Sequence, residues 1–376
     1  MNDAQFLGPL TDEERAILTE NHFQIADFLE LRRRYLDGEL SPAKNRVSGV
    51  VSAPLTGELR PMASRYSEAG ERYIRLGRSA LERGEVGALI LNGGMATRFG
   101  GAVKGCVEVF DGLSFLGLKL HEARRRGPRV PVLLMNSFAT HDQTIAHLEQ
   151  HDYFGFEPEN LLAFRQNVSI RLTPDGQIFR KADATETLYA PGHGDLPDAV
   201  GRGALEQFRA RGGKYLLMSN VDNILATLDP LIIGMHIDAQ QRGIEMTVES
   251  VEKDPGDTGG MPARVDGHLQ VVEAFRFPAS FDLDMIPVFN TNTFIFNADA
   301  LDQDFELTWF VVEKKVDDQG VIQFERLAGE LSTYLKTEFL VVPRRDEESR
   351  FLPIKTREDL DQHRAFIKSQ VQSWQG

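Results

Sequence analysis

From residue 86 onward, apolar residues fall into short continuous runs, and amphipathic segments separate these runs. Five of them have the length of a buried strand and read GALIL, VPVLLM, LLAF, KYLLMS and IEMTVES. The segments between them have helical periodicity and include 114–125, 141–151, 198–211 and 229–241. Apolar strands that alternate with helices are covered on both faces, so the pattern predicts an α/β domain with a mixed, mainly parallel sheet.

The first 80 residues have a different pattern, which predicts a helical N-terminal segment. Thr11 and Glu14 have the spacing of a capping box, and helical periodicity continues after them. Farther along, the Asp-Gly pairs of TPDGQ and RVDGH predict two tight hairpin turns. Residues 356–374 are expected to form a closing helix. We therefore expect a helical segment over 1–80 and an α/β domain over 81–376.

Composition and charge limit the classes of function. The 376 residues are 41% hydrophobic and 26% charged, which is ordinary for a soluble globular protein. A net charge of −14 argues against nucleic-acid and anionic-membrane partners, so an anionic small ligand would need a local group of Lys and Arg. One cysteine, Cys106, excludes an internal disulfide, and its type favours a small buried residue. With no run near the ~18 apolar residues of a membrane span and no secretory signal, we expect a cytoplasmic protein.

Polar residues follow directly after the apolar runs. Because ligands of open α/β sheets bind beyond the carboxyl ends of the strands, we expect these residues to line one pocket. A helix cap explains any one of them, but it does not readily explain five. The segments are 92–94, 136–138, 165–167, 219–223 and, after the run IPVF, 290–292.

The loop LNGGMATRFGGAVKG, residues 91–105, suits phosphate. It lacks the spacing of a Walker A loop and of a dinucleotide-binding loop, so ATPase and dehydrogenase functions are not indicated. Glycine N–H groups beside Arg98 and Lys104 match a polyphosphate. Asp222, between two asparagines at a strand tip, is expected either to bind Mg²⁺ with that polyphosphate or to cap the next helix. The stretch YAPGHGDL around His193 has no adjacent nucleophile and is interpreted as a loop that approaches a flat ring.

In combination these pieces resemble one family. The stretches GHGDL, SNVDN, FNTNTF and SRFLPIKTREDL occur in the order seen in UTP–glucose-1-phosphate uridylyltransferases, and the resemblance covers about residues 75–370. It implies a glycosyltransferase-A-like, Rossmann-like nucleotidyltransferase domain whose sugar-binding part lies at about 244–315. It also implies Mg²⁺-dependent transfer of UMP from UTP to glucose 1-phosphate, which yields UDP-glucose and pyrophosphate.

The resemblance assigns roles to individual residues. Lys104, Arg98 and Lys355 are expected to neutralise the phosphates, and Asp222 to bind the metal. Gln166, Gly192 and His193 are expected to recognise the uracil, and Glu273, Asn290 and Asn292 to lie beside the hexose. The remaining candidates for substrate binding are Leu91, Asn92, Gly93, Gly94, Asn220, Asn223 and Gly260.

The sequence departs from the family in several places. Val103 stands where a proline usually precedes the loop lysine, which would leave the loop less rigid. Thr258 stands where a lysine commonly lies near the phosphates, and Arg264 or Lys253 is the candidate to replace it. The chain ends soon after KTREDL, so the C-terminal β-helix of many eukaryotic members is not expected.

Two alternatives stay open at this stage. The same chemistry on galactose 1-phosphate or N-acetylhexosamine 1-phosphate is one, because NTNTFI replaces the family's NTNNLW beside the hexose. The other is a UTP- or UDP-sugar-binding protein with weak or no turnover, which Thr258 and Val103 would suit. Oligomeric state and the role of residues 1–75 are left undetermined.

Overall fold

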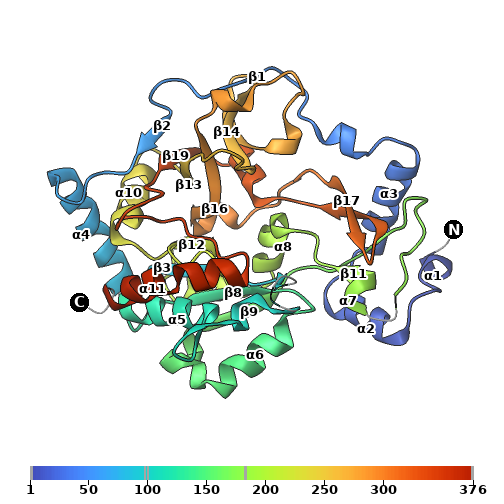
Figure 1. Ribbon diagram of the computed structural model, residues 1–376, viewed down its shortest axis with the longest axis horizontal. Coiled ribbons are helices and arrows are strands. Elements are labelled where there is room, and N and C mark those ends of the chain that lie inside the picture. Colours follow the sequence, from blue (N-terminus) through green and yellow to red (C-terminus); the bar gives the residue numbers. More distant parts are fainter. Residues whose placement is uncertain (1–2, 97–98, 100, 182–183, 374–376) are drawn as a thin grey trace.

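An eight-stranded sheet forms the centre of the computed structural model, which describes residues 3–96, 99, 101–181 and 184–373. The strand order is β2-β19-β13-β16-β12-β3-β8-β9, and Figure 1 shows these strands following one another across the molecule. Every neighbouring pair is parallel except the two that β16 makes, with β12 and with β13. The predicted mixed, mainly parallel sheet is confirmed.

The elements have the following bounds. The central strands are β2 Leu59–Pro61, β3 Val86–Leu91, β8 Val132–Asn136, β9 Leu161–Arg165, β12 Tyr215–Asn220, β13 Met246–Glu252, β16 Val288–Asn297 and β19 Thr337–Val341. Smaller sheets of two or three strands are formed by β1 Val51–Ser52, β4 Met95–Ala96, β5 Ala102–Val103, β6 Glu108–Phe110, β7 Leu113–Ser114, β10 Ser169–Ile170, β11 Leu188–Tyr189, β14 Gly260–Val265, β15 His268–Glu273, β17 Phe310–Val316 and β18 Gln319–Glu325. The α-helices are α1 Asp3–Phe6, α2 Asp12–Glu20, α3 Ile25–Leu36, α4 Glu68–Glu82, α5 Phe115–Arg126, α6 His141–Gln150, α7 Ala184–Thr187, α8 Leu196–Gly201, α9 Ala204–Ala210, α10 Pro230–Gln240 and α11 Arg357–Ser373.

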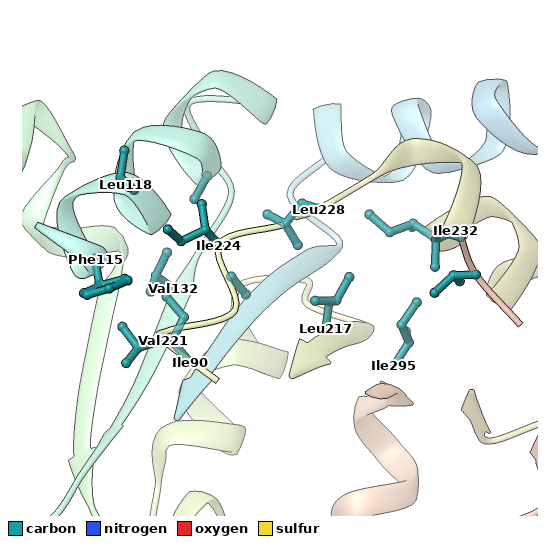
Figure 2. Packing of buried hydrophobic residues seen from close by; sticks show 14 of the residues in the cluster. Ile90, Phe115, Leu118, Val132, Leu217, Val221, Ile224, Leu228, Ile232 and Ile295 are labelled. Atoms are coloured by element: carbon teal, nitrogen blue, oxygen red, sulfur yellow. The ribbon is translucent and has the colours of Figure 1, made fainter. Parts of the chain in front are cut away.

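Two hydrophobic clusters cover the two faces of the sheet. Successive strand residues point to opposite faces, and in β3 Ile90 belongs to one cluster and Leu89 to the other. Helices α4, α5, α10 and α11 cover the first face, where Figure 2 shows Ile90, Val132 and Leu217 in one hydrophobic cluster with Leu118 and Ile232. Helices α8 and α9 cover the second face. This two-sided burial is the reason why the strand runs are apolar throughout.

The N-terminal helices form a third cluster with two distant hairpins. Phe28 of α3 packs on Phe324 of β18 with ring centroids 6.1 Å apart, and Ile170 of β10 lies in the same cluster. Figure 1 shows α1, α2 and α3 beside β11 and β17. The capping box of Thr11 and Glu14 is confirmed at the start of α2.

Two predicted elements were wrong in part. The expected helix over 198–211 is two helices, because the chain turns at Gly203, whose φ of +112° is a left-handed conformation. The expected strand end before 290–292 lies inside β16, which continues to Asn297 through a bulge in its pairing with β13. The RVDGH hairpin, the other named helices and the closing helix are present as expected. The TPDGQ turn is also present, but the residues on either side of it, Leu172 and Ile178, are paired by a single isolated β-bridge.

Candidate functional site

A cleft of about 400 Å³ lies where β3, β8, β9 and β12 end. Three of the five predicted rim segments, 92–94, 165–167 and 219–223, contribute to this lining at the carboxyl edge of the sheet, whereas 136–138 and 290–292 do not. Within the described ranges, no helix combines the length and apolar character that crossing a bilayer requires. The cleft is lined by Leu91, Gly93, Gly94, Lys104, Met135, Gln166, Ala190, Gly192, His193, Asn220, Val221, Asp222, Lys314 and Glu325.

The glycine loop after β3 is held from beneath by Asn92. This side chain is 1% exposed and donates to Asn136 Oδ1 at 2.8 Å and to Thr144 Oγ1 at 3.0 Å. A Cβ on Gly105 would lie 2.2 Å from Asn92 Oδ1, so the chain carrying the loop lysine passes directly over it. Asn92 thus supports the loop and does not line the cleft, contrary to our expectation. Arg98 lies outside the described residues.

Gln166, Gly93 and Gly94 form one wall of the cleft. A Cβ on Gly93 would lie 2.2 Å from Gln166 Nε2, whereas a Cβ on Gly94 would meet nothing within 4 Å. The absence of a side chain at Gly93 therefore makes room for the Gln166 amide, and its absence at Gly94 leaves the loop backbone accessible to a ligand. The backbone of Gln166 is fixed by donation to Asn136 O at 2.9 Å.

Lys104 and Asp222 meet across the cleft as an ion pair. Lys104 begins a 3₁₀ turn after β5, and Asp222 follows the end of β12. Their side chains are 18% and 14% exposed, so both remain reachable from the cleft. Among the described residues, no group of three His, Cys, Asp or Glu side chains could hold a metal ion without help from a ligand. Asp222 offers a single carboxylate that already faces a cationic group.

The opposite wall is the loop around His193. Gly192 has a φ of +90°, and a Cβ there would lie 2.5 Å from the carbonyl oxygen of Arg326. The backbone N–H of Ala328 donates to His193 Nδ1 at 3.0 Å, so the neutral ring carries its proton on Nε2. Burial lowers the pKa of His193 to about 4, which excludes an imidazolium at neutral pH.

The bulge of β16 brings its asparagines to the same edge. Asn292 adopts a φ of +55°, donates through Nδ2 to Asn220 Oδ1 at 2.9 Å, and donates through its backbone N–H to Asn290 Oδ1 at 2.7 Å. Asn292 Oδ1 is buried without a hydrogen bond among the described residues. Because β16 runs antiparallel to β12, the early part of this strand reaches the edge where the parallel strands end.

Gly260 and Glu273 lie side by side at the start of β14 and the end of β15. A Cβ on Gly260 would be 2.8 Å from Glu273 Oε1, so the absent side chain makes room for this carboxyl group. Burial raises the pKa of Glu273 to about 7, and Arg276 acts against this rise. The carboxyl group is therefore able to donate as well as accept a hydrogen bond near neutral pH.

Asn223 has a different place from the one we expected. It is 1% exposed, accepts from the Leu352 N–H at 2.9 Å, and donates to Arg350 O at 3.3 Å. These bonds fasten the segment that leads to Lys355, whose side chain is exposed. Asn223 thus joins two parts of the cleft edge and does not line the cleft.

Buried charges beneath this edge were missed by the sequence analysis. Lys119 donates to Asn223 O at 2.8 Å and Ala226 O at 2.7 Å, and burial lowers its pKa to about 8. Arg350 forms a two-pronged pair with Glu249, with distances of 2.8 and 2.7 Å. A helix lysine or a loop arginine has no sequence signal for such burial.

The departures from the family pattern have structural consequences. Val103 is fully buried with a φ of −64°, the value that a proline would impose, so the loop has that geometry without it. Neither candidate for the missing cation faces the cleft: Lys253 donates to Leu283 O at 2.7 Å, and Arg264 pairs with Glu58. Lys314 of β17 lines the cleft instead, paired with Glu325 of β18 at 2.5 Å.

Comparison with known proteins gives a consistent family. A family profile described as UTP–glucose-1-phosphate uridylyltransferase matches residues 74–371. A protein of that name from Astragalus penduliflorus is 31% identical over 293 residues, which cover 72% of this chain and 60% of the relative. The chain spans about three fifths of the length of the first curated relatives it matches.

Solved structures share the fold. The UDP-N-acetylglucosamine pyrophosphorylase from Trypanosoma brucei, in complex with an inhibitor, superposes with a TM-score of 0.78 at 20% identity, covering 96% of this chain and 80% of that one. A mutant UDP-glucose pyrophosphorylase from Leishmania major gives a TM-score of 0.72 at 22% identity, covering 93% and 78%.

Proposed function

Because the chain belongs to the UTP–glucose-1-phosphate uridylyltransferase family, we propose that it transfers UMP from UTP to glucose 1-phosphate, giving UDP-glucose and pyrophosphate. The observation that carries this proposal is the Lys104–Asp222 pair in a cleft whose walls are Gln166 and the Gly192–His193 loop. That arrangement offers a charge-neutralising end and a flat, hydrogen-bonding end within one cavity, which matches a nucleoside triphosphate.

The proposed reaction requires that the two substrates are positioned and that their negative charge is neutralised. An oxygen of the sugar phosphate attacks the α-phosphorus of UTP, and the bond from that phosphorus to the leaving pyrophosphate breaks. The attacking oxygen is already ionised, so the reaction needs no general base. The neutral His193 on the opposite wall therefore has no role as a base in this proposal. Catalysis then rests on holding the two anions in line and stabilising their crowded charge.

Each charged residue has a part in this proposal. Lys104 turns from Asp222 to the triphosphate when the nucleotide binds, and Lys355 approaches from the segment attached to Asn223. Asp222 would hold Mg²⁺, since one protein carboxylate suits an ion that keeps waters and shares phosphate oxygens. When bound, the ion supplies positive charge to the phosphates.

Different residues are proposed to bind the nucleobase and the hexose. Gln166 and the backbone of Gly192 and His193 recognise the uracil, while Glu273, Asn290 and Asn292 lie beside the hexose. The free Oδ1 of Asn292 and the carboxyl group of Glu273 provide an acceptor and a donor for sugar hydroxyl groups.

Release of pyrophosphate tests the proposal. Purified protein is incubated with UTP, Mg²⁺ and glucose 1-phosphate, and parallel reactions contain galactose 1-phosphate or N-acetylglucosamine 1-phosphate. We expect the fastest release with glucose 1-phosphate. Faster release with another sugar phosphate would reassign the substrate, and normal UTP binding with no release for any sugar would identify a binding protein.

A further inference from the structure

The back of the base-recognition loop, residues 191–195, rests on the residues that follow β18. The backbone N–H of Arg326 donates to Pro191 O at 2.8 Å, and that of Gly194 donates to Arg326 O at 2.9 Å. A Cβ on Gly194 would lie 2.3 Å from the backbone nitrogen of Leu327. The loop therefore has no free space behind it, and its shape follows the position of Arg326.

The side chain of Arg326 binds the same loop a second time. Its guanidinium donates to Asp195 Oδ1 at 2.5 Å and to Asp198 Oδ2 at 2.6 Å, and its Cζ lies 4.5 Å from the ring centre of Trp309. Arg326 is 8% exposed and Asp195 is fully buried. A planar guanidinium between two carboxylates and an indole ring has one orientation that satisfies all three contacts.

Asp195 connects Arg326 to the Gln166 wall of the cleft. Its carboxylate accepts the backbone N–H of Asn167 and also the Asn167 side-chain amide, the latter at 2.6 Å. Asn167 directly follows Gln166, the residue that faces Gly93. Burial raises the pKa of Asp195, and Arg326 acts against this rise, so the arginine favours the charged form of the carboxylate that accepts these bonds.

We propose that Arg326 is a positioning residue for nucleobase selectivity, which sets the spacing between the Gly192–His193 wall and the Gln166 wall. The inference rests on the proposed function, because it presumes that these walls enclose uracil. Arg326 does not line the cleft itself, and it acts through Asp195 and the backbone of 191–194. A uracil and a cytosine differ only in the groups on one ring edge, so a small change in wall spacing reduces the discrimination between them.

The experiment measures binding of UDP and CDP by calorimetry, without sugar phosphate or metal. Arg326→Met keeps the length of the side chain but removes the guanidinium, and we expect its preference for UDP over CDP to fall about tenfold. Arg326→Lys keeps the charge without the planar guanidinium and is expected to restore the preference only in part. The double variant Arg326→Met with Asp195→Asn removes the unpaired buried carboxylate, so it separates selectivity from folding.

Arg60→Met is the matched control. Like Arg326, Arg60 combines ion-paired and aromatic contacts: it donates to both carboxylate oxygens of Glu338, at 3.1 and 3.0 Å, and it lies over the ring of Tyr73, but it is on β2 at the far edge of the sheet. We expect this variant to lose stability and keep the wild-type preference.

The outcomes are distinguishable. Loss of UDP preference in both Arg326→Met and the double variant supports the inference. Wild-type preference in Arg326→Met, or its recovery in the double variant, would overturn it, since the effect would then be absent or due to buried charge alone. A wild-type protein with equal affinity for UDP and CDP would overturn the proposed function and the inference together.

Discussion

The backbone N–H of Ile354 donates to the backbone carbonyl of Asp222 at 3.1 Å. This bond attaches the segment before α11 to the tip of β12, and the Asn223 amide adds two further bonds to the same segment. The residue after Ile354 is Lys355. The proposed metal-binding carboxylate and the second proposed phosphate-binding lysine are therefore carried by two parts of the chain that are fastened to each other.

Asp222→Asn is expected to lower pyrophosphate release at least about 100-fold, because the amide has no charge with which to hold a cation among the phosphates. Thermal unfolding should shift by only a few degrees, since the side chain is accessible from the cleft. Asp238→Asn is the control: Asp238 is 13% exposed, pairs with Arg72 and Arg242, and does not line the cleft. An active Asp222→Asn variant would show that the metal assignment is wrong.

Lys355→Met should lower kcat about 100-fold while UDP binding weakens much less, because this lysine is proposed to stabilise charge that builds up during transfer. The side chain is exposed, so stability should be unchanged. Lys214→Met provides the comparison, since Lys214 is 58% exposed and pairs with Glu85 before the start of β12, at the opposite end of that strand. Equal kcat values for Lys355→Met and wild type would remove Lys355 from the proposed mechanism.

Gly192→Ala tests the packing of the base-recognition loop. Gly192 and Gly212 have φ values of +90° and +91°, but a Cβ on Gly192 would lie 2.5 Å from Arg326 O, and one on Gly212 would meet nothing within 4 Å. Gly212→Ala should therefore cost only the backbone strain of about 1–2 kcal/mol in the free energy of unfolding. Gly192→Ala should cost more and also weaken UDP binding, as measured by denaturant unfolding and calorimetry. Equal costs would show that the loop can move away from Arg326.

Local patterns in the sequence were sufficient for much of the fold. The apolar run of β3 and the capping box at Thr11 depend on neighbouring residues, so each could be predicted from a short window. The direction of β16 could not, because it depends on which strands pair far apart in the chain. Gly203 was overlooked as a helix break because the apolar periodicity continues across it.

The candidate site, like the fold, could be predicted from the sequence only in part. Lys104 and Asp222 were identified because motifs carry them, and the structure brings them together. Asn92 and Asn223 stand in the same motifs yet face inward, and a sequence does not tell which side of a loop an amide faces. Lys119 and Arg326 had no signal at all, because burial of a charge is decided by partners that lie a hundred or more residues away in the sequence.

The burial of His236 predicts how the stability of the folded protein depends on pH. It is fully buried in α10, with Nε2 3.0 Å from Asn297 Oδ1 and Nδ1 2.8 Å from Thr247 Oγ1. Asn297 Nδ2 donates to Ile244 O, so its Oδ1 is the acceptor, and the neutral ring donates from Nε2 and accepts at Nδ1. A second proton would have to displace the Thr247 hydroxyl hydrogen, and burial lowers the pKa of His236 to about 4.

The unfolded chain binds a proton at His236 near pH 6.5, whereas the folded protein does so only near pH 4. Stability is therefore complete above pH 6.5 and falls as the pH drops toward 4, by about 1.4 kcal/mol per pH unit for this one group. His236→Gln removes the titrating group, so denaturant unfolding should show a smaller decline for the variant across this range, even if it is less stable at pH 7. The pKa of His193 is also lowered to about 4, so its titration contributes to the decline that remains in the variant. Parallel stability curves for His236→Gln and wild type between pH 6.5 and 4 would mean that the buried ring accepts its second proton without opening the structure.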